Sequence, residues 1–367
     1  MSVTPLEIER MFDYTIAMSD ATRGRGTALN PANRFEELAY EWEESADPAE
    51  RPAPKTRFYR DSAKSILVKN DSPDIPFTWS LNPYRGCEHG CVYCYARPYH
   101  EYLGLSSGID FESMIFVKED APRLLAAELA KPSWQVETIA LGGVTDVYQP
   151  IERKLKITRG CLEVMADARQ PCGLVTKNAL VVRDLDVFQE LRRHAGARVY
   201  VSLTTLDPEL ARRMEPRASA PSARLEAMRT LAKGGVQVGV MTAPMILGLN
   251  DHEMPKLLEA AAEAGATTAG YVPLRLPHEL GTLFEDWLQR NYPDRKEKVL
   301  NQIKNIRGGR LNDPRFGARM RGEGIFAEHL AKLFSITCRR LGLNKRRPPA
   351  MERENFRRPM GDQLRLL

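Results

Sequence analysis

The chain has 367 residues, of which 43% are hydrophobic and 28% are charged, and its net charge is +5. That length suffices for one large domain with extensions or for two ordinary domains, and the composition is typical of a globular protein. No apolar run is long enough to predict a membrane span, and the start of the chain lacks the apolar centre of a secretory signal. We therefore expect a cytoplasmic protein with no membrane partner.

The chain divides into three parts by its pattern. Residues 1–75 are expected to form an N-terminal extension of loop and short helix, because RGRGTALNPANRF and the acidic, Pro-bearing stretch after it show no clean period. Residues 76–280 alternate short apolar runs with longer stretches of helical spacing. Strands are expected at 138–143, 173–178, 199–205, 236–245 and 267–276, with a sixth near 77–84, and helices at 154–169, 187–194, 222–235 and 253–266. This alternation predicts a parallel α/β sheet, either flat or closed toward a barrel.

The remaining residues, 281–367, are expected to form a helical extension with a basic tail. Helices are predicted at 287–306 and 324–343. From Arg310 onward the chain carries 14 basic and six acidic residues. Such a tail suits contacts with phosphates, so nucleic acid is a candidate partner, and a merely solvated tail is the alternative.

Three of the six cysteines lie close together, in the string CEHGCVYC, as Cys87, Cys91 and Cys94. Thiolates suit iron–sulfur clusters or zinc. A zinc site usually has four ligands, and no second Cys or His pair follows here. A [4Fe–4S] cube is usually held by four cysteines, so three would leave one iron open to a substrate or cofactor. The cluster is our prediction, with zinc or three buried inert cysteines as alternatives.

CEHGCVYC resembles the CxxxCxΦC signature of radical S-adenosylmethionine (SAM) enzymes, with Tyr93 as the aromatic residue. The resemblance implies that the three cysteines hold a [4Fe–4S] cluster and that SAM chelates the fourth iron. It implies reductive cleavage of SAM to a 5′-deoxyadenosyl radical, a reductant such as flavodoxin or ferredoxin, and a partial (β/α)6 barrel. The strings CVYCYARPYHEYLG, GGVTDVYQPIE, LVTKN and VSLTTLD look like the spore-photoproduct-lyase-like branch and its DNA-repair-photolyase-like members, over roughly residues 75–280.

The same resemblance implies a set of SAM contacts at the carboxyl ends of the strands, where parallel barrels place their sites. The matching positions are Tyr93, Tyr95, Gly142, Gly143, Thr145, Lys177, Ser202 and Ala243. By this match the Gly142–Gly143 backbone receives the SAM amino group, and the Lys177 ammonium pairs with the SAM carboxylate as a point charge.

One departure from the lyases concerns the hydrogen donor. They carry a cysteine near the end of the second strand, and the matching position here is Gly143. Glycine cannot return a hydrogen atom, so repair of the thymine spore photoproduct is not expected. The substitute donors considered are Cys161, Cys172, Tyr148 and Tyr271.

Two alternative roles are predicted for each of four further charged residues. Asp146 and Glu152 either line the substrate pocket or cap the next helix. Glu215 and Arg217, in MEPRAS, either bind the SAM ribose or substrate or form a surface salt bridge.

The predicted function is a radical SAM enzyme, lyase-like or an oxidoreductase, whose substrate is unassigned. Nucleic acid is the first substrate hypothesis, because the chain resembles the lyases and carries a basic tail. A protein or small-molecule substrate is the alternative, since fold does not fix function. A non-catalytic iron–sulfur or zinc module is the third reading.

Overall fold

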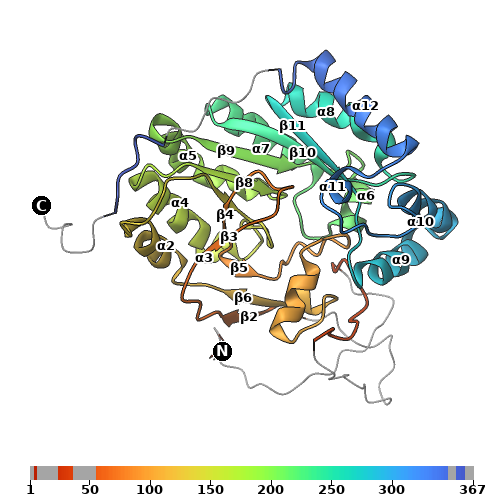
Figure 1. Cartoon of the computed structure of the whole chain (residues 1–367), viewed down its shortest axis with the longest axis horizontal. Helices are drawn as coiled ribbons and strands as arrows, with labels where there is room; N and C mark the ends of the chain where they lie inside the picture. Colours follow the sequence, from red (N-terminus) through yellow and green to blue (C-terminus); the bar gives the residue numbers. More distant parts are fainter. Residues whose placement is uncertain (1–3, 6–23, 36–54, 346–352, 360–367) are drawn as a thin grey trace, which may run out of the picture.

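The computed structural model describes residues 4–5, 24–35, 55–345 and 353–359. Six parallel strands form its centre, as the alternation predicted. They are β4 (Trp79–Leu81), β7 (Ile139–Leu141), β8 (Cys172–Thr176), β9 (Ala197–Ser202), β10 (Gln237–Met245) and β11 (Thr268–Pro273). The strand order is β11-β10-β9-β8-β7-β4, with β3 (Leu67–Lys69) antiparallel at the β4 edge (Figure 1). Because each strand lies beside its predecessor, the carboxyl ends of all six meet at one edge of this partial barrel.

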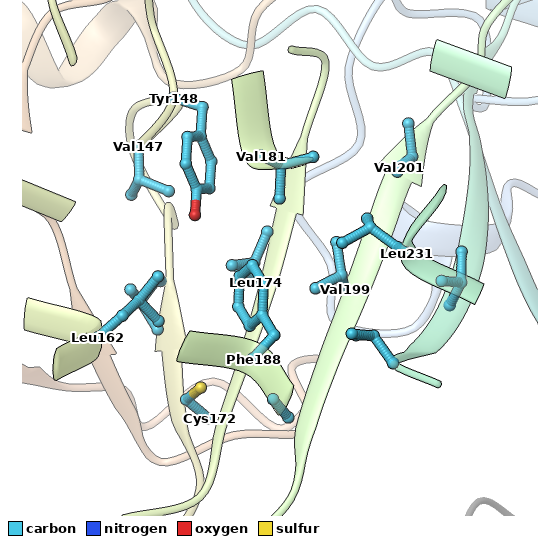
Figure 2. Packing of buried hydrophobic residues seen from close by; sticks show 14 of the residues in the cluster. Val147, Tyr148, Leu162, Cys172, Leu174, Val181, Phe188, Val199, Val201 and Leu231 are labelled. Atoms are coloured by element: carbon cyan, nitrogen blue, oxygen red, sulfur yellow. The ribbon is translucent and has the colours of Figure 1, made fainter. Parts of the chain in front are cut away.

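Helical segments connect these strands and cover one face of the sheet. They are α2 (Ala121–Ala130), α3 (Glu152–Leu155), α4 (Ile157–Asp167), η3 (Ala179–Asp184), α5 (Leu185–His194), α6 (Pro208–Met214), α7 (Pro221–Lys233), η4 (Asp251–Glu253) and α8 (Met254–Glu263). Figure 2 shows Leu174 of β8 and Val199 of β9 packed among Leu162, Phe188 and Leu231 of the helices. The next residue along β8, Val175, points to the opposite face of the sheet and is 40% exposed. The inner face of the sheet is therefore accessible to solvent at this position.

A second sheet includes two strands from residues 1–75, where loop and short helix were expected; residues 6–23 and 36–54, to which much of that expectation applies, lie outside the described residues. Its strands are β1 (Thr4–Pro5), β2 (Arg57–Arg60), β6 (Met114–Val117) and β5 (Tyr84–Arg85), hydrogen-bonded in that order. Between β5 and β6 lie η2 (Arg97–Leu103) and α1 (Asp110–Ser113). All four residues of β6 are buried. The strands span two to four residues, so they are too short to show a period-two pattern in the sequence.

The C-terminal extension is helical, as predicted. It contains α9 (Leu280–Asn291), η5 (Pro293–Arg295), α10 (Lys296–Asn305), α11 (Ala318–Arg321) and α12 (Ile325–Leu341). The single helix expected at 287–306 is interrupted at Pro293, which lacks an amide donor and cannot continue a helix. In the described part of the chain, no helix is long and apolar enough to cross a membrane.

Arg307 joins this extension to the barrel. Its buried guanidinium donates hydrogen bonds to the carbonyl oxygens of Pro273 and Leu274, at the end of β11, and of Ala318 and Arg319 in α11. The donor–acceptor distances are 2.7–3.1 Å for these four bonds. One side chain, Arg307, therefore links the last barrel strand to α11.

Residues 353–359 of the basic tail lie on the barrel helices (Figure 1). The Asn355 amide donates to the His194 carbonyl (3.0 Å), and the Arg357 backbone donates to the Ala168 carbonyl (2.8 Å). These carbonyls end α5 and α4, which run antiparallel to the strands. This stretch of the tail thus lies at the amino ends of the strands, opposite the edge where their carboxyl ends meet.

Candidate cluster and cofactor site

The three clustered cysteines lie on one loop, residues 87–94, which follows β5. Gly86 and Gly90 allow its sharp turns, with φ of 78° and 64°. Cys87 and Cys91 are buried, and Cys94 is half-buried. The Cys94 amide donates to the Cys91 carbonyl (3.2 Å), which closes a tight turn around the last two cysteines. We call these eight residues the cysteine loop.

The chemistry of the cysteine loop suits an iron–sulfur cube. Burial raises the pKa of the Cys87 thiol well above its usual range, and the nearby Asp146, Cys91 and Cys94 raise that pKa further. Among the described residues, no three His, Cys, Asp or Glu side chains converge to hold one metal ion. A zinc ion would need sulfurs about 2.3 Å from a single point, whereas each cysteine of a cube binds a different iron. Three thiols with no fourth protein ligand in the described part of the chain are the donor set of a cube with one open iron, whereas a structural zinc usually has four ligands.

The cysteine loop is supported from outside by residues 24–35, which we call the strap (Figure 1). The Gly26 and Thr27 amides donate to the two carboxylate oxygens of Glu112, at 2.9 and 3.1 Å. Arg97, also fully buried, forms an ion pair with the same carboxylate at 2.5 Å. Gly26 lies directly against the backbone of Gly90. Sequence reasoning missed this contact, although a glycine-rich RGRG is the composition that such a close backbone approach requires.

Asp146 ties the cysteine loop to the end of β8. Its carboxylate accepts hydrogen bonds from the Thr176 hydroxyl (2.7 Å) and the Lys177 amide (2.8 Å). The His89 Nδ1 lies 3.3 Å from the same carboxylate, and its Nε2 is 3.2 Å from the Asn178 amide nitrogen. Burial alone would raise the Asp146 pKa, but His89 and the hydrogen bonds outweigh it and lower the pKa to about 2. Asp146 is thus an anion that fixes the loop.

Glu152 caps a helix, which is one of the two roles that the sequence predicted for it. Its side chain is fully buried, and one carboxylate oxygen accepts the Thr158 amide at 3.0 Å, in the first turn of α4. The hydroxyl of Tyr84 donates to the same oxygen. Glu152 therefore caps a helix and does not line a pocket.

The glycine turn after β7 meets the cysteine loop. The Tyr95 hydroxyl donates to the Gly143 carbonyl at 2.7 Å, and the Thr145 hydroxyl donates to the Gly86 carbonyl at 2.6 Å. Gly142 has a φ of 88°, which a side chain would strain, whereas Gly143 has room for a β-carbon. Thr145 thus stabilises the entry to the cysteine loop.

Tyr93 belongs to a buried ionic group behind the cysteine loop. Its hydroxyl donates to Glu215, which also pairs with the buried guanidinium of Arg224. The Lys177 ammonium lies 5.7 Å from the centre of the Tyr93 ring. Burial would lower the Lys177 pKa, but the charges of Cys91 and Glu215 raise it overall, so Lys177 stays a cation. Glu215 is therefore not part of a surface salt bridge.

Arg217, the neighbour of this group, lies at the edge of the strap. Its guanidinium donates to the Thr56 hydroxyl at 3.0 Å and stands 3.5 Å from the Glu88 carboxylate. The side chain is one-third exposed. Arg217 therefore holds residue Glu88 of the cysteine loop in a half-buried ion pair.

Ser202 and Ala243 stand beside Lys177 at the carboxyl ends of adjacent strands. Val201 pairs with Thr176, so Ser202 and Lys177 are the next residues on their strands, and Ser202 pairs with Met241. The Ser202 hydroxyl is 3.4 Å from the carbonyl oxygens of Met241 and Ala243, at the outer limit of hydrogen bonding. A buried hydroxyl with such weak partners can serve a bound ligand.

The candidate hydrogen donors lie away from Gly143. Cys161 and Cys172 are buried in the hydrophobic core, and Cys172 begins β8 at the amino end of the sheet. The Tyr148 side chain also lies in the core (Figure 2). Its hydroxyl donates to Asp184 at 3.0 Å. Tyr271 is half-buried against the ring of Phe334. None of the four occupies the place of the lyase cysteine.

Comparisons with known proteins identify the family and relatives of the chain. The Radical SAM superfamily profile matches residues 81–261. An uncharacterized protein of Mycobacterium tuberculosis is 37% identical over 240 residues, which cover 65% of this chain and 71% of the relative. An uncharacterized protein of Methanocaldococcus jannaschii is 28% identical over 222 residues, 60% of this chain and 79% of the relative.

Solved structures share the fold. Spore photoproduct lyase complexed with dinucleoside spore photoproduct has a TM-score of 0.55 and 18% identity, covering 75% of this chain and 78% of that one. A mutant of that lyase with bound AdoMet (SAM) and the same ligand has a TM-score of 0.54 at the same identity and coverage. On the profile match, the identity to the mycobacterial relative and the shared barrel, the chain belongs to the radical SAM superfamily.

Proposed function

We propose that this protein is a radical SAM enzyme in which Cys87, Cys91 and Cys94 hold a [4Fe–4S] cluster. The observation that supports it best is the position of all three thiols on one fixed eight-residue loop, whose Tyr93 ring lies 5.7 Å from the Lys177 ammonium. When bound, the cluster and SAM supply a 5′-deoxyadenosyl radical that abstracts hydrogen, with an electron from a donor such as flavodoxin or ferredoxin.

The chain's own residues position SAM in this proposal. The Lys177 ammonium attracts the SAM carboxylate, and the Ser202 hydroxyl donates to a polar SAM atom in place of its weak backbone contacts. The backbone carbonyl oxygens of the Gly142–Gly143 turn accept hydrogen bonds from the SAM amino group. Glu215 fixes the Tyr93 ring, so the ring presents a fixed face to the adenine.

We further propose nucleic acid as the substrate class, because exposed aromatic rings from the strap and from the segment after the cysteine loop lie together. Tyr99, Tyr102 and Phe35 are 52, 67 and 56% exposed. The Phe35 and Tyr102 rings stack with centroids 5.0 Å apart, and Tyr99 lies 6.2 Å from Tyr102. Arg275, after β11, lies 5.1 Å from the Tyr95 ring and has no ion-pair partner within the described ranges. Unpaired bases stack on such rings, and arginine attracts their phosphates.

The cluster is tested by anaerobic reconstitution followed by measurement of iron, sulfide and 5′-deoxyadenosine. Replacing Cys87, Cys91 or Cys94 with Ala should remove the cluster and the product. Cys161→Ala and Cys338→Ala are matched controls that should keep full iron content. A triple variant of the loop cysteines that retains full iron would refute the proposal.

The substrate class is tested separately, with the Tyr99→Ala/Tyr102→Ala variant and a single-stranded oligonucleotide. Each lost stacking contact should weaken binding by about 1–3 kcal/mol. Phe326→Ala removes a comparably exposed ring on α12 and should change nothing. Equal oligonucleotide affinity in all three proteins would favour the protein or small-molecule substrate instead.

A further inference from the structure

Asn82 directly follows β4 and stands beside the glycine turn that follows β7. Leu81 packs into the hydrophobic core on the helix-covered face, and side chains alternate along a strand, so Asn82 and Ser80 belong to the inner face. The Leu81 carbonyl accepts the Gly142 amide at 3.1 Å. A β-carbon added at Gly143 would lie 3.9 Å from the Asn82 Nδ2 and 3.8 Å from the Ser80 β-carbon. Asn82 therefore borders the space at Gly143, at the carboxyl edge of the sheet.

The orientation of the Asn82 side chain is fixed. Its Oδ1 accepts a hydrogen bond from the Val144 amide at 3.0 Å. Its backbone carbonyl accepts a second bond, from the buried Lys118 ammonium, at 3.1 Å. A backbone amide can only donate, so the atom that faces Val144 is the oxygen and the other is the nitrogen. Asn82 thus holds its NH2 group in one direction.

This NH2 group is unused within the protein. The Asn82 side chain is only 6% exposed, yet Nδ2 has no hydrogen-bond partner among the described residues. The neighbouring Ser80 hydroxyl has one contact, 3.4 Å from the Val68 carbonyl oxygen, at the outer limit of hydrogen bonding. A buried donor without an acceptor destabilises a fold and calls for a functional explanation. A bound molecule that supplies the acceptor is such an explanation.

We propose that Asn82 determines substrate specificity, and that its Nδ2 donates to a carbonyl oxygen of the substrate. The inference rests on the proposed function, because it concerns the substrate of that same site. SAM is the other molecule in the site, but its amino group is itself a donor and cannot accept from Nδ2. Its carboxylate is assigned to Lys177, which follows β8, two strands or roughly 10 Å away in the sheet. The remaining partner for Asn82 is the substrate.

The fixed amide also restricts which nucleobase fits. Asparagine recognises adenine by using its oxygen and its nitrogen together. At Asn82 the oxygen is already bound to the Val144 amide, so the side chain can only donate. Thymine and guanine each present a keto oxygen that accepts such a bond. Asn82 therefore selects a keto base over adenine.

Titration of the reconstituted full chain with single-stranded oligothymidine and oligoadenosine decanucleotides, followed by fluorescence anisotropy, tests the inference. The native chain should bind the thymidine probe more tightly. Asn82→Asp keeps the oxygen that accepts the Val144 amide but replaces the donor with an acceptor. It should bind the thymidine probe about tenfold more weakly and lose the preference. Asn301→Asp adds the same charge at an exposed position of α10 and should keep the preference. SAM affinity should be equal in all three proteins.

Each contrary outcome has a distinct meaning. No binding of either probe by the native chain would refute nucleic acid as the substrate class, and this inference with it. Binding with an unchanged preference in Asn82→Asp would overturn the role of Asn82 alone and leave the substrate class standing. Equal affinity of the native chain for both probes would overturn the selection of a keto base, whether or not the variant folds. Weaker SAM binding in Asn82→Asp, with thymidine binding unchanged, would assign the amide to the cofactor and also overturn the inference.

Discussion

Gly26→Ala would separate the strap from the cysteine loop. An added β-carbon at position 26 would lie 2.7 Å from the Gly90 carbonyl carbon and closer still to its oxygen. Ordinary carbon contacts need about 3.5 Å, so the strap must retreat by roughly 1–2 Å. That shift breaks the bonds from the Gly26 and Thr27 amides to the Glu112 carboxylate. Bonds to a charged group contribute about 1.5–3 kcal/mol each, so the docked strap would lose roughly 3–6 kcal/mol.

Amide hydrogen exchange measures this loss locally. Residues 24–30 and 86–92 should exchange faster by two or more orders of magnitude, while β8 and β9 stay protected. Gly173→Ala is the matched control, because a β-carbon there meets its nearest atom at 3.9 Å. Unchanged exchange at both segments in Gly26→Ala would show that the strap does not support the cysteine loop.

Three further predictions concern the site and its surroundings. Lys177→Ala and Ser202→Ala should each weaken SAM binding by about 1–3 kcal/mol in equilibrium titrations, and unchanged affinity in both would exclude them as ligands. Glu215→Gln removes the partner of buried Arg224 and should destabilise the fold by about 3–5 kcal/mol in urea unfolding; a loss below 1 kcal/mol would contradict the buried pairing. Burial lowers the His100 pKa to about 3, so the unfolded chain alone binds its proton as pH falls below about 6.5. Stability should therefore drop by about 2 kcal/mol more between pH 7 and 5 in the native chain than in His100→Phe, and identical pH dependence would refute this.

The barrel could be predicted because each of its strands is a short apolar run followed by residues at helical spacing. The cysteine spacing and the order of the strings around Gly143, Lys177 and Ser202 likewise lie in local sequence. Helix α6 was missed although Asp207 and Pro208 form a start signal, with the Asp207 carboxylate accepting the Glu209 and Leu210 amides. At seven residues, α6 is too short to show a helical period.

The supports of the site could not be predicted, because their partners are distant in sequence. Gly26 and Glu112 are 86 residues apart, and the Tyr93 hydroxyl reaches Glu215 across 122 residues. No pattern among neighbouring residues in the sequence indicates which distant residues will form such hydrogen bonds. Asp146 illustrates the same limit, since a carboxylate at a strand end looks alike in sequence whether it lines a pocket or anchors a loop.

The buried hydrogen bonds of Arg307 have a consequence for handling the protein. Its charge is solvated by four carbonyl dipoles out of contact with water, so dissolved ions screen it little. Exposed ion pairs such as Arg229–Glu226, by contrast, are screened well by salt. High salt should therefore weaken the surface ion pairs, while Arg307 keeps the last barrel strand attached to α11.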